Sequence, residues 1–236
     1  MIRVNKLLNK DVWDTVCDDP SCGEFRVEIK PEVRKALLKI AYDFLEALDP
    51  KMKFTDITLT GSMANYNYTD QSDLDLHVLF DFDAEGESGD LIQDLFNAKR
   101  RIWNDGHDIK VRDHDVELYA QDTNEPHHST GVFSVLRNKW LVVPQRTNPA
   151  IDEEYVLKKS QDIMDRIDFL VDLEDKRSSL QNTKDKIMKM RKAGLERKGE
   201  FAEENLIFKT LRNTGYIGKL NDIIRNEYDR SVSLDQ

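Results

Sequence analysis

The sequence predicts a mixed α/β domain followed by a helical domain, with a boundary near residue 150. Up to Pro144, segments with the two-residue period of strands alternate with amphipathic helical segments. After Pro144 the strand patterns vanish and three helical stretches follow. We therefore assign residues 1–150 to an α/β domain and residues 151–236 to a helical domain.

The first two predicted elements are a helix and a strand. Residues 31–48 carry apolar side chains at helical spacing, with Pro31 in the first turn, where proline is tolerated. Asp49 and Pro50 then end the helix. Residues 54–61 alternate apolar side chains with threonine and end in glycine, which predicts a strand that runs into a turn.

A loop, a strand and a helix are predicted next. The polar and aromatic segment 62–72 predicts one or two helical turns and a loop. Residues 73–82 begin by alternating acidic with apolar side chains and predict a second strand. Residues 90–104 predict a second helix, which packs on the sheet. We expect its buried face to consist of aliphatic residues at helical spacing, namely Leu91, Leu95, Ala98 and Ile102.

The remaining strand signals precede the helical part. The segment 107–122 is compatible with two short strands or one long strand. Residues 131–144 predict a hairpin whose turn contains Arg137 and Asn138. Helical periodicity then covers residues 152–174, 176–193 and 201–228.

The composition predicts a soluble, cytoplasmic protein with no membrane partner. Charged residues make up 34% and hydrophobic residues 39% of the chain. No apolar run approaches the length of about 18 residues that a membrane span requires. The first residues also lack the unbroken apolar stretch of a secretory signal. Cys17 and Cys22 lack the second Cys or His pair that tetrahedral zinc requires, so we expect both thiols to be reduced.

The charge balance limits the expected partners. The chain has 35 basic and 45 acidic residues, which gives a formal net charge of -10. This excess of acid argues against a broad basic face that would grip long nucleic acid, so duplex DNA is not an expected partner. A small phosphorylated ligand, or a local contact with nucleic acid, is compatible with this acidic net charge.

The residues with the clearest chemical meaning lie between 59 and 76. Gly61 and Ser62 are followed by a ten-residue spacer and then by Asp73-Leu74-Asp75-Leu76. Strand pleating places Asp73 and Asp75 on one face, about 7 Å apart. Carboxylates so arranged can share hard cations such as Mg²⁺.

The turn before these carboxylates suits phosphate. Gly61 ends a predicted strand and Ser62 opens a predicted helical turn, where backbone N–H groups and a hydroxyl can hold phosphate oxygens. A phosphate-binding turn beside a metal pair is suited to phosphoryl or nucleotidyl transfer. The structural alternative is a turn glycine followed by a strand whose exposed face is acidic. Walker, zincin and serine-hydrolase motifs are absent from the sequence.

This arrangement resembles the signature of the DNA polymerase beta nucleotidyltransferase superfamily, in which an apolar residue, G-S and a spacer precede D-x-D between apolar residues. Thr60 departs from the signature, because the apolar Leu59 lies one position earlier. The resemblance implies the nucleotidyltransferase mixed β-sheet with flanking helices, and a third carboxylate from a later strand. Glu117 is the best candidate for that carboxylate, and Asp115, on the same face, is the alternative.

The segments LTGSMANYNYTDQSDLDLHVLFDF, VELYAQD and ENLIFKTLRNTGYIGKLNDII also resemble uncharacterised nucleotidyltransferase-like proteins of tailed phages. The resemblance implies a phage protein in the host cytoplasm. It further implies transfer of an NMP from an NTP to an acceptor, with Mg²⁺ or Mn²⁺ as cofactor and release of pyrophosphate. Asp73, Asp75 and Glu117 would hold the metal ions, and Gly61 and Ser62 would orient the phosphates.

For an active transferase, the acceptor could be an RNA end, a protein or a small molecule. Two other functions stay open beside it. A catalytically silent nucleotide-binding module, acting as a sensor or as an inhibitor of a host partner, is the first alternative. A purely structural or interaction protein is the second.

Several other residues allow a functional and a structural interpretation. Tyr66 and Tyr68 could stack on a base or pack the loop on the sheet. His77 could support the metal carboxylates or bond to backbone. The pair at 127–128, two histidines, could meet a nucleotide or lie in an ordinary loop. The basic stretch 184–200 is a solvated helix face or a positive wall for a triphosphate or an RNA end.

Overall fold

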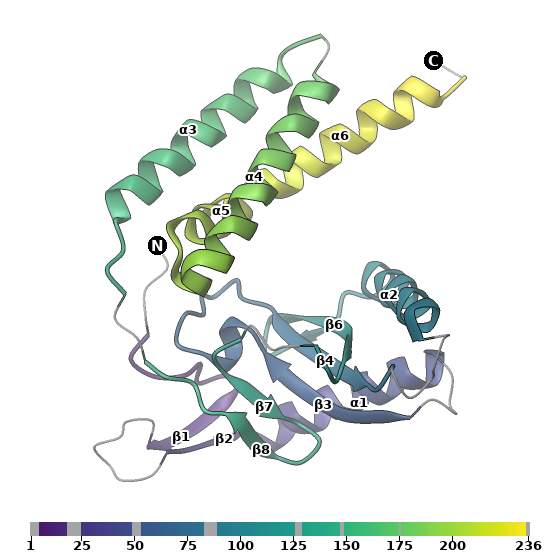
Figure 1. The fold of residues 1–236 in the computed structure, drawn as a ribbon, viewed down its shortest axis with the longest axis vertical. Helices are drawn as coiled ribbons and strands as arrows, with labels where there is room; N and C mark the ends of the chain where they lie inside the picture. The colour runs from purple at the N-terminus through teal and green to yellow at the C-terminus, as the bar shows by residue number, and fades with distance from the viewer. Residues whose placement is uncertain are drawn as a thin grey trace. The chain divides into compact units, whose positions relative to one another are not determined.

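The structure, a computed structural model, combines a mixed sheet with helices, as the mixed α/β prediction requires. Contacts divide the chain near residue 147 into two compact units, an α/β unit and a helical unit (Figure 1). The structure describes residues 5–17, 25–48, 53–82, 89–125, 129–146, 149–174 and 176–234.

The central element of the α/β unit is a six-stranded sheet with the order β5-β6-β4-β3-β7-β8. Its strands are β3 (Phe54–Thr60), β4 (Leu74–Phe80), β5 (Lys110–Val111), β6 (His114–Asp122), β7 (Val132–Ser134) and β8 (Lys139–Val142). Only β4 and β6 pair in parallel within this sheet, and the other neighbours are antiparallel. The sheet is therefore mixed, and its second and third strands, β6 and β4, share one direction.

The turns between these strands explain how the sequence closes the sheet. Arg112 and Asp113 both have positive φ angles, 53° and 64°, and join β5 to β6 in a tight hairpin. The segment 107–122 thus contains two strands, one of which is long. Asn138, with φ 54°, lies in the turn between β7 and β8, which confirms the predicted hairpin at 131–144.

Helix α1 (Pro31–Leu48) has the predicted bounds and covers one face of the sheet (Figure 1). It buries Val33, Leu37, Ile40, Ala41, Phe44, Leu45 and Leu48 in a core with apolar residues of β3, β4 and β6. In β3, Ile57 and Leu59 belong to this core, and in β4, Leu74 and Leu76 do. Since strand side chains alternate between faces, the intervening polar residues of β3 and β4 lie on the opposite face of the sheet.

Helix α2 (Gly89–Gly106) exists as predicted, but its predicted buried face is wrong. Leu91, Leu95 and Ile102 are exposed, with relative exposures of 73%, 51% and 73%. The buried side of the helix instead contains Phe96. Phe96 contacts Phe80 and Phe82 edge to face, with ring centroids 4.8 and 5.6 Å apart.

Two apolar stripes on α2 explain this error. Ile92, Phe96 and Trp103 follow the same helical spacing as the aliphatic stripe, offset by one residue. Ile92 and Trp103 are partly buried and pack against the core. Because aromatic side chains bury more apolar area, the stripe that contains them faces the core.

A second, two-stranded sheet was not predicted from the sequence. It pairs β1 (Trp13–Cys17) with β2 (Arg26–Ile29) in antiparallel fashion. Trp13 is buried against Phe133 and Trp140, with ring centroids 5.1 and 4.6 Å away. Cys17 is disulfide-bonded, so the expectation of a reduced thiol is wrong there, while Cys22 lies outside the described residues.

The helical unit contains α3 (Glu153–Val171), α4 (Arg177–Lys198), α5 (Glu203–Asn213) and α6 (Tyr216–Val232). Asp152 caps α3 by accepting a hydrogen bond from the Tyr155 N–H at 2.9 Å. The stretch 201–228, expected as one helix, is broken at Gly215, whose φ of 81° favours glycine. The break lets α5 and α6 pack separately.

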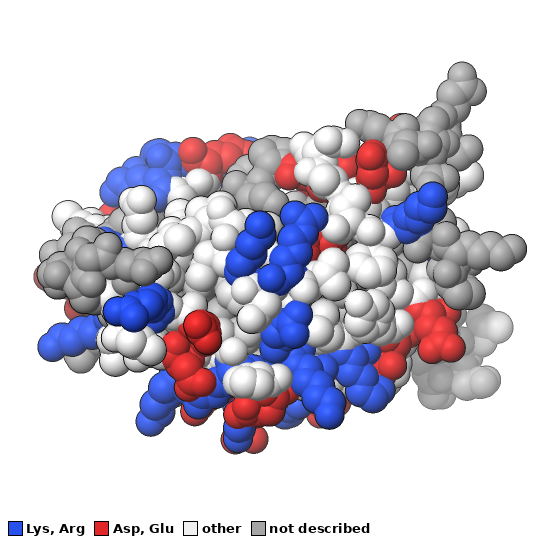
Figure 2. Space-filling model, turned by 90° about the horizontal axis from the view of Figure 1, so that it is seen from below, with Lys and Arg blue, Asp and Glu red and all other residues white. Residues whose placement is uncertain are grey.

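Charged side chains are unevenly distributed over the surface. Figure 2 shows Lys and Arg side chains gathered across the middle of one face, with acidic side chains around them. An overall acidic chain therefore still has basic surface that an anionic partner could contact. Among the described helices, none combines the length and apolar character needed to cross a membrane.

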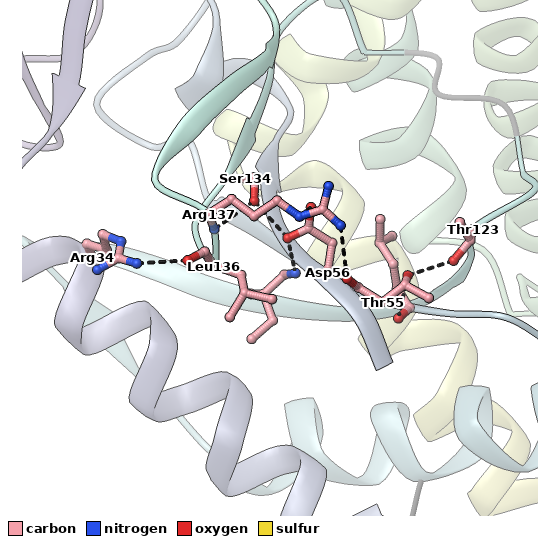
Figure 3. A network of polar contacts seen from close by, with 9 residues as sticks. Arg34, Thr55, Asp56, Thr123, Ser134, Leu136 and Arg137 are labelled. Atoms are coloured by element: carbon pink, nitrogen blue, oxygen red, sulfur yellow. Dashed lines mark hydrogen bonds and ion pairs between the residues drawn. The ribbon is translucent and has the colours of Figure 1, made fainter. Parts of the chain in front are cut away.

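A buried carboxylate holds the turn between β7 and β8 to the start of β3 (Figure 3). Asp56, 3% exposed, accepts hydrogen bonds from the Ser134 hydroxyl at 2.7 Å and from the Ile57 N–H at 2.8 Å. Arg137 lies 3.4 Å from its other oxygen and also donates to the Thr55 carbonyl at 3.3 Å. Together these contacts satisfy the buried charge.

Replacing this carboxylate should destabilise the α/β unit. We expect Asp56→Ala to lower its free energy of unfolding by about 2 kcal/mol, because bonds to a buried charged acceptor are lost. Tryptophan fluorescence during urea unfolding measures this, since all three Trp residues lie in that unit. The control is Asp43→Ala, which removes an exposed pair with Lys39 and should cost less than about 1 kcal/mol. Equal losses in the two variants would contradict the account.

Candidate functional site

A row of acidic and polar side chains lies on the sheet face opposite α1. Asp75 and His77 are half-buried and alternate along β4 with the buried Leu74, Leu76 and Val78. Asp73 is also half-buried and lies directly before the first residue of β4. The two carboxylates of the D-x-D motif therefore have the alternation that the sequence predicted.

Glu117, the predicted third carboxylate, lies beside Asp75. Strand β6 runs parallel to β4, and Asp75 is in register with Glu117. Paired positions of neighbouring strands present their side chains on the same face, and such strands lie about 4.8 Å apart. The register thus brings together two carboxylates that are 42 positions apart in the sequence.

Asp115, the alternative third carboxylate, is engaged elsewhere. Its side chain is 57% exposed and lies 2.9 Å from the Lys110 ammonium of β5. The ion pair raises the pKa of Lys110, chiefly through the hydrogen bond to Asp115 and the attraction of its charge. The geometry favours Glu117 over Asp115 as the neighbour of Asp75.

Gly61, in the turn after β3, lies against the Asp75 carboxylate. Strand β3 ends at Thr60, which pairs with Asp75. Gly61 has φ 71° and ψ −159°, a conformation that side-chain-bearing residues rarely adopt. A Cβ at this position would lie 1.8 Å from the Asp75 Oδ2. Glycine is therefore required for the Asp75 carboxylate to lie against the turn.

Ser62 opens a short 3-10 helix, η2 (Ser62–Ala64), as the sequence predicted. Its hydroxyl donates to the Ser72 Oγ at 2.9 Å, which also accepts the Thr69 N–H at 2.9 Å. The Gly61 N–H donates to the Ser129 Oγ at 3.3 Å. The G-S turn is thus held by hydroxyl groups from two other segments.

Sequence reasoning missed these hydroxyl partners and one buried histidine. His114, at the start of β6, lies 2.9 Å from the Ser72 carbonyl through Nδ1 and 3.5 Å from the Asn9 amide through Nε2. It joins the residue before Asp73 to the N-terminal segment. Ser72 has a weak sequence signal, its position next to the D-x-D motif, but Ser129 and Asn9 have none.

A stack of side chains continues the polar face beyond the carboxylates. His77 and Tyr119 are in register, and their rings stack with centroids 4.6 Å apart. The His77 Nδ1 lies 2.7 Å from the Gln121 Oε1. His77 therefore bonds to a side chain of β6 rather than to backbone at this nitrogen.

Tyr119 lies next to the carboxylate pair, and Arg100 lies against Tyr119. Burial raises the pKa of Tyr119, and the nearby charges of Asp75 and Glu117 raise it further, so the phenol stays a neutral donor. The Arg100 guanidinium lies 5.1 Å from the Tyr119 ring centre. The buried Nε of Arg100 has no hydrogen-bond partner among the described residues. A cation with a spare donor thus lies against Tyr119.

The aromatic residues of the spacer support the loop. Tyr66 is buried, and its carbonyl accepts the Asn5 N–H at 2.7 Å. The Arg146 guanidinium lies 5.0 Å from the Tyr66 ring centre. Tyr68 packs against the core, and burial, with the charges of Asp11 and Asp70, raises its pKa. These contacts favour the packing interpretation for both tyrosines.

The structure describes only one of the two weaker candidate sites. The histidine pair at 127–128 lies outside the described residues. The basic stretch 184–200 lies on α4 and the turn after it, where Arg197 and Lys198 pair with Glu204 and Glu203. Lys186, Lys189 and Lys192 are exposed. Part of this basic stretch is therefore neutralised within the helical unit itself.

The donor set suits a hard divalent cation, because carboxylate oxygens are the ligands that Mg²⁺ and Mn²⁺ prefer. Asp73 and Asp75 supply them from the start of β4, and Glu117 supplies one from the adjacent β6. Within the described parts of the chain, no group of three or more His, Cys, Asp or Glu side chains is arranged to hold a metal ion. A bound cation would require these side chains to turn toward one another.

No protein-family model, curated protein or solved structure matches this chain. The resemblance to the nucleotidyltransferase signature therefore has no support from a relative. A functional conclusion depends on the residues of the site and their geometry.

The contact between Gly61 and Asp75 can be tested with two glycine substitutions. Gly199 has nearly the same backbone conformation, φ 67° and ψ −152°, but nothing lies within 4 Å of a Cβ there. Both Gly61→Ala and Gly199→Ala should cost about 1–3 kcal/mol for backbone strain. Gly61→Ala should cost more, because its methyl group meets Asp75.

Urea unfolding measures both losses. Tryptophan fluorescence follows the α/β unit that contains Gly61, and far-UV circular dichroism follows the helices around Gly199. If both variants lose the same free energy of unfolding, the Asp75 carboxylate does not require a glycine at position 61.

Proposed function

We propose that the chain is a metal-dependent nucleotidyltransferase, which moves an NMP from an NTP to the hydroxyl of an acceptor. The observation that carries this proposal is the parallel register of Asp75 with Glu117, with Gly61 packed against the Asp75 carboxylate. A turn glycine lets the backbone approach a phosphate closely, and carboxylate oxygens are ligands that divalent cations prefer.

The proposed reaction follows from the donor set. The acceptor hydroxyl releases its proton to solvent and its oxygen forms a bond to the α-phosphorus. The bond between that phosphorus and the oxygen bridging to the β-phosphate breaks, and pyrophosphate leaves. Asp73, Asp75 and Glu117 would hold Mg²⁺ or Mn²⁺. When bound, such ions lower the pKa of the acceptor hydroxyl and neutralise charge on the triphosphate.

The remaining residues of the site have positioning roles in this proposal. The turn at Gly61 and Ser62 would approach the β- and γ-phosphates closely, because no side chain projects from Gly61. Tyr119, kept neutral by burial and by two carboxylates, keeps its proton as a donor. Arg100 places a positive charge against the Tyr119 ring. Placement and charge compensation therefore dominate the proposed mechanism.

A second candidate is a nucleotide-binding module without turnover, which would sense nucleotide or inhibit a host partner. Two observations favour it. The Ser62 hydroxyl is already bonded to Ser72. The described residues also contain no group of three side chains arranged for a metal ion. This module would bind NTP and be stabilised by it, but would release no pyrophosphate.

Pyrophosphate release decides between these functions. We expect the chain to release pyrophosphate from an NTP with Mg²⁺ or Mn²⁺, and Asp73→Asn, Asp75→Asn and Glu117→Gln each to reduce the rate at least about 100-fold. Asp115→Asn, the matched control on the same strand, should retain most of the rate. Total RNA, protein extract and small hydroxyl compounds, added separately, should identify the acceptor class by stimulation.

Two results would contradict the proposal, one for the site and one for the reaction. Full activity of Asp75→Asn would show that the carboxylate pair is not the site. NTP-dependent thermal stabilisation without pyrophosphate release under any supplement would instead select the silent binding module.

A further inference from the structure

Three polar side chains are buried together where the N-terminal segment meets the start of β6. Asn9, Ser72 and His114 are only 4%, 4% and 6% exposed. Polar groups buried this deeply are bonded in native proteins, and a buried polar network whose members are bonded rigidifies the structure around it. The contacts of His114 decide what this network holds in place.

His114 bonds to the peptide group that leads into the D-x-D motif. Its Nδ1 lies 2.9 Å from the Ser72 carbonyl oxygen. A carbonyl oxygen only accepts, so Nδ1 carries a proton and donates it. The Ser72 carbonyl and the Asp73 N–H belong to one planar peptide unit. The bond from His114 therefore fixes the orientation of the backbone at Asp73.

The opposite ring nitrogen faces a donor. The Asn9 Oδ1 accepts the Asp11 N–H at 2.7 Å, which identifies the other amide atom of Asn9 as Nδ2. That Nδ2 lies 3.5 Å from the His114 Nε2. An amide NH₂ group only donates, so Nε2 fits this contact only without a proton. The two neighbours thus select one tautomer, the neutral ring protonated on Nδ1.

The segment that carries Asn9 is itself anchored. The Asn9 carbonyl accepts the Val12 N–H at 3.2 Å and the Trp13 N–H at 2.9 Å. The indole of the buried Trp13 donates to the Met63 carbonyl of η2 at 2.7 Å. The Asn9 side chain therefore contacts His114 from a fixed position.

Ser72 connects His114 to both halves of the motif. Its carbonyl lies in the peptide unit before the first aspartate, where His114 binds it. Its hydroxyl accepts hydrogen bonds from the Ser62 hydroxyl and the Thr69 N–H, both at 2.9 Å. His114 lies three positions before Glu117 on β6. The strand that supplies the third carboxylate thus also anchors the G-S turn and the start of the D-x-D motif.

We propose that His114 is a positioning residue of the candidate site. As the neutral ring protonated on Nδ1, it holds the Ser72 carbonyl and thereby fixes Asp73 on one side and Ser62 on the other. It acts through Ser72 and not on the reacting atoms. Its effect on the reaction rests on the proposed function, whereas its effect on the order of residues 69–72 does not.

Nitrogen-15 NMR of the full chain with labelled histidine measures the tautomer. At neutral pH we expect the His114 ring to have a protonated Nδ1 and an unprotonated Nε2. The signal is assigned by its loss in His114→Asn. A ring that carries a proton on Nε2 would contradict the inference.

Two substitutions separate positioning from simple loss of the ring. His114→Asn places an amide N–H where Nδ1 lies and can keep the bond to the Ser72 carbonyl. His114→Gln carries its amide one bond farther, at the Nε2 position, and loses that bond. Amide hydrogen exchange at Thr69 and Ser72 measures the order of the loop, since these N–H groups bond within it. We expect exchange about tenfold faster in His114→Gln and close to wild type in His114→Asn.

Pyrophosphate release extends the comparison to the reaction. His114→Gln should lower the rate at least about tenfold, because small displacements of positioned groups cost up to about 100-fold, whereas His114→Asn should retain most of the rate. The matched control is His107→Gln. His107 also contacts a carbonyl through Nδ1, that of Trp103 at 2.8 Å, but it is exposed and lies outside the 69–72 loop. This control should leave exchange and rate unchanged.

The results separate this inference from the proposed function. Faster exchange and slower pyrophosphate release in His114→Gln, both restored in His114→Asn, support positioning. Equal effects of the two substitutions, or exchange at the wild-type rate in His114→Gln, overturn it. A wild type that releases no pyrophosphate removes the transferase proposal, and the exchange data then decide the positioning of Ser72 by themselves.

Discussion

The parallel pairing of β4 with β6 is the constraint on which the candidate site depends. The pairing fixes Asp75 beside Glu117 and His77 beside Tyr119, because residues in register share a face. A shift by one residue would move Glu117 to the apolar face and bring Leu118 out of the core. Burial of Leu74, Leu76 and Leu118 under α1 therefore maintains the same register that brings the carboxylates together.

Much of this arrangement could be predicted from the sequence because its signals are local. The bounds of α1, the alternation along β4 and the hairpin at 131–144 follow from periodicity and turn residues. Gly61 was identifiable as the end of β3, since a glycine at a strand end indicates a turn. The reason that only glycine fits there, the Asp75 carboxylate, is visible only in the structure.

The features that the sequence did not predict are of two kinds. Some depend on which of two helix faces packs against the core, and others involve residues that belong to no recognisable sequence pattern. On α2, two apolar stripes of equal period compete, and the one with Phe96 and Trp103 faces the core because it contacts Phe80, Phe82 and Phe44. The β1–β2 hairpin and the hydroxyl groups around the G-S turn have no spacing that would reveal them. Leu91, Leu95 and Ile102 remain exposed because the aromatic side of α2 faces the core instead.

The central claim is that Asp75 and Glu117 form one cation site. Electron paramagnetic resonance of Mn²⁺, titrated into the full chain with a non-hydrolysable NTP analogue, tests it without any need for an acceptor. The account predicts saturable binding that weakens at least about tenfold in Asp75→Asn and in Glu117→Gln, because each loses an anionic ligand. Mn²⁺ binding of equal strength in the wild type and both variants, or no binding at all, would contradict it.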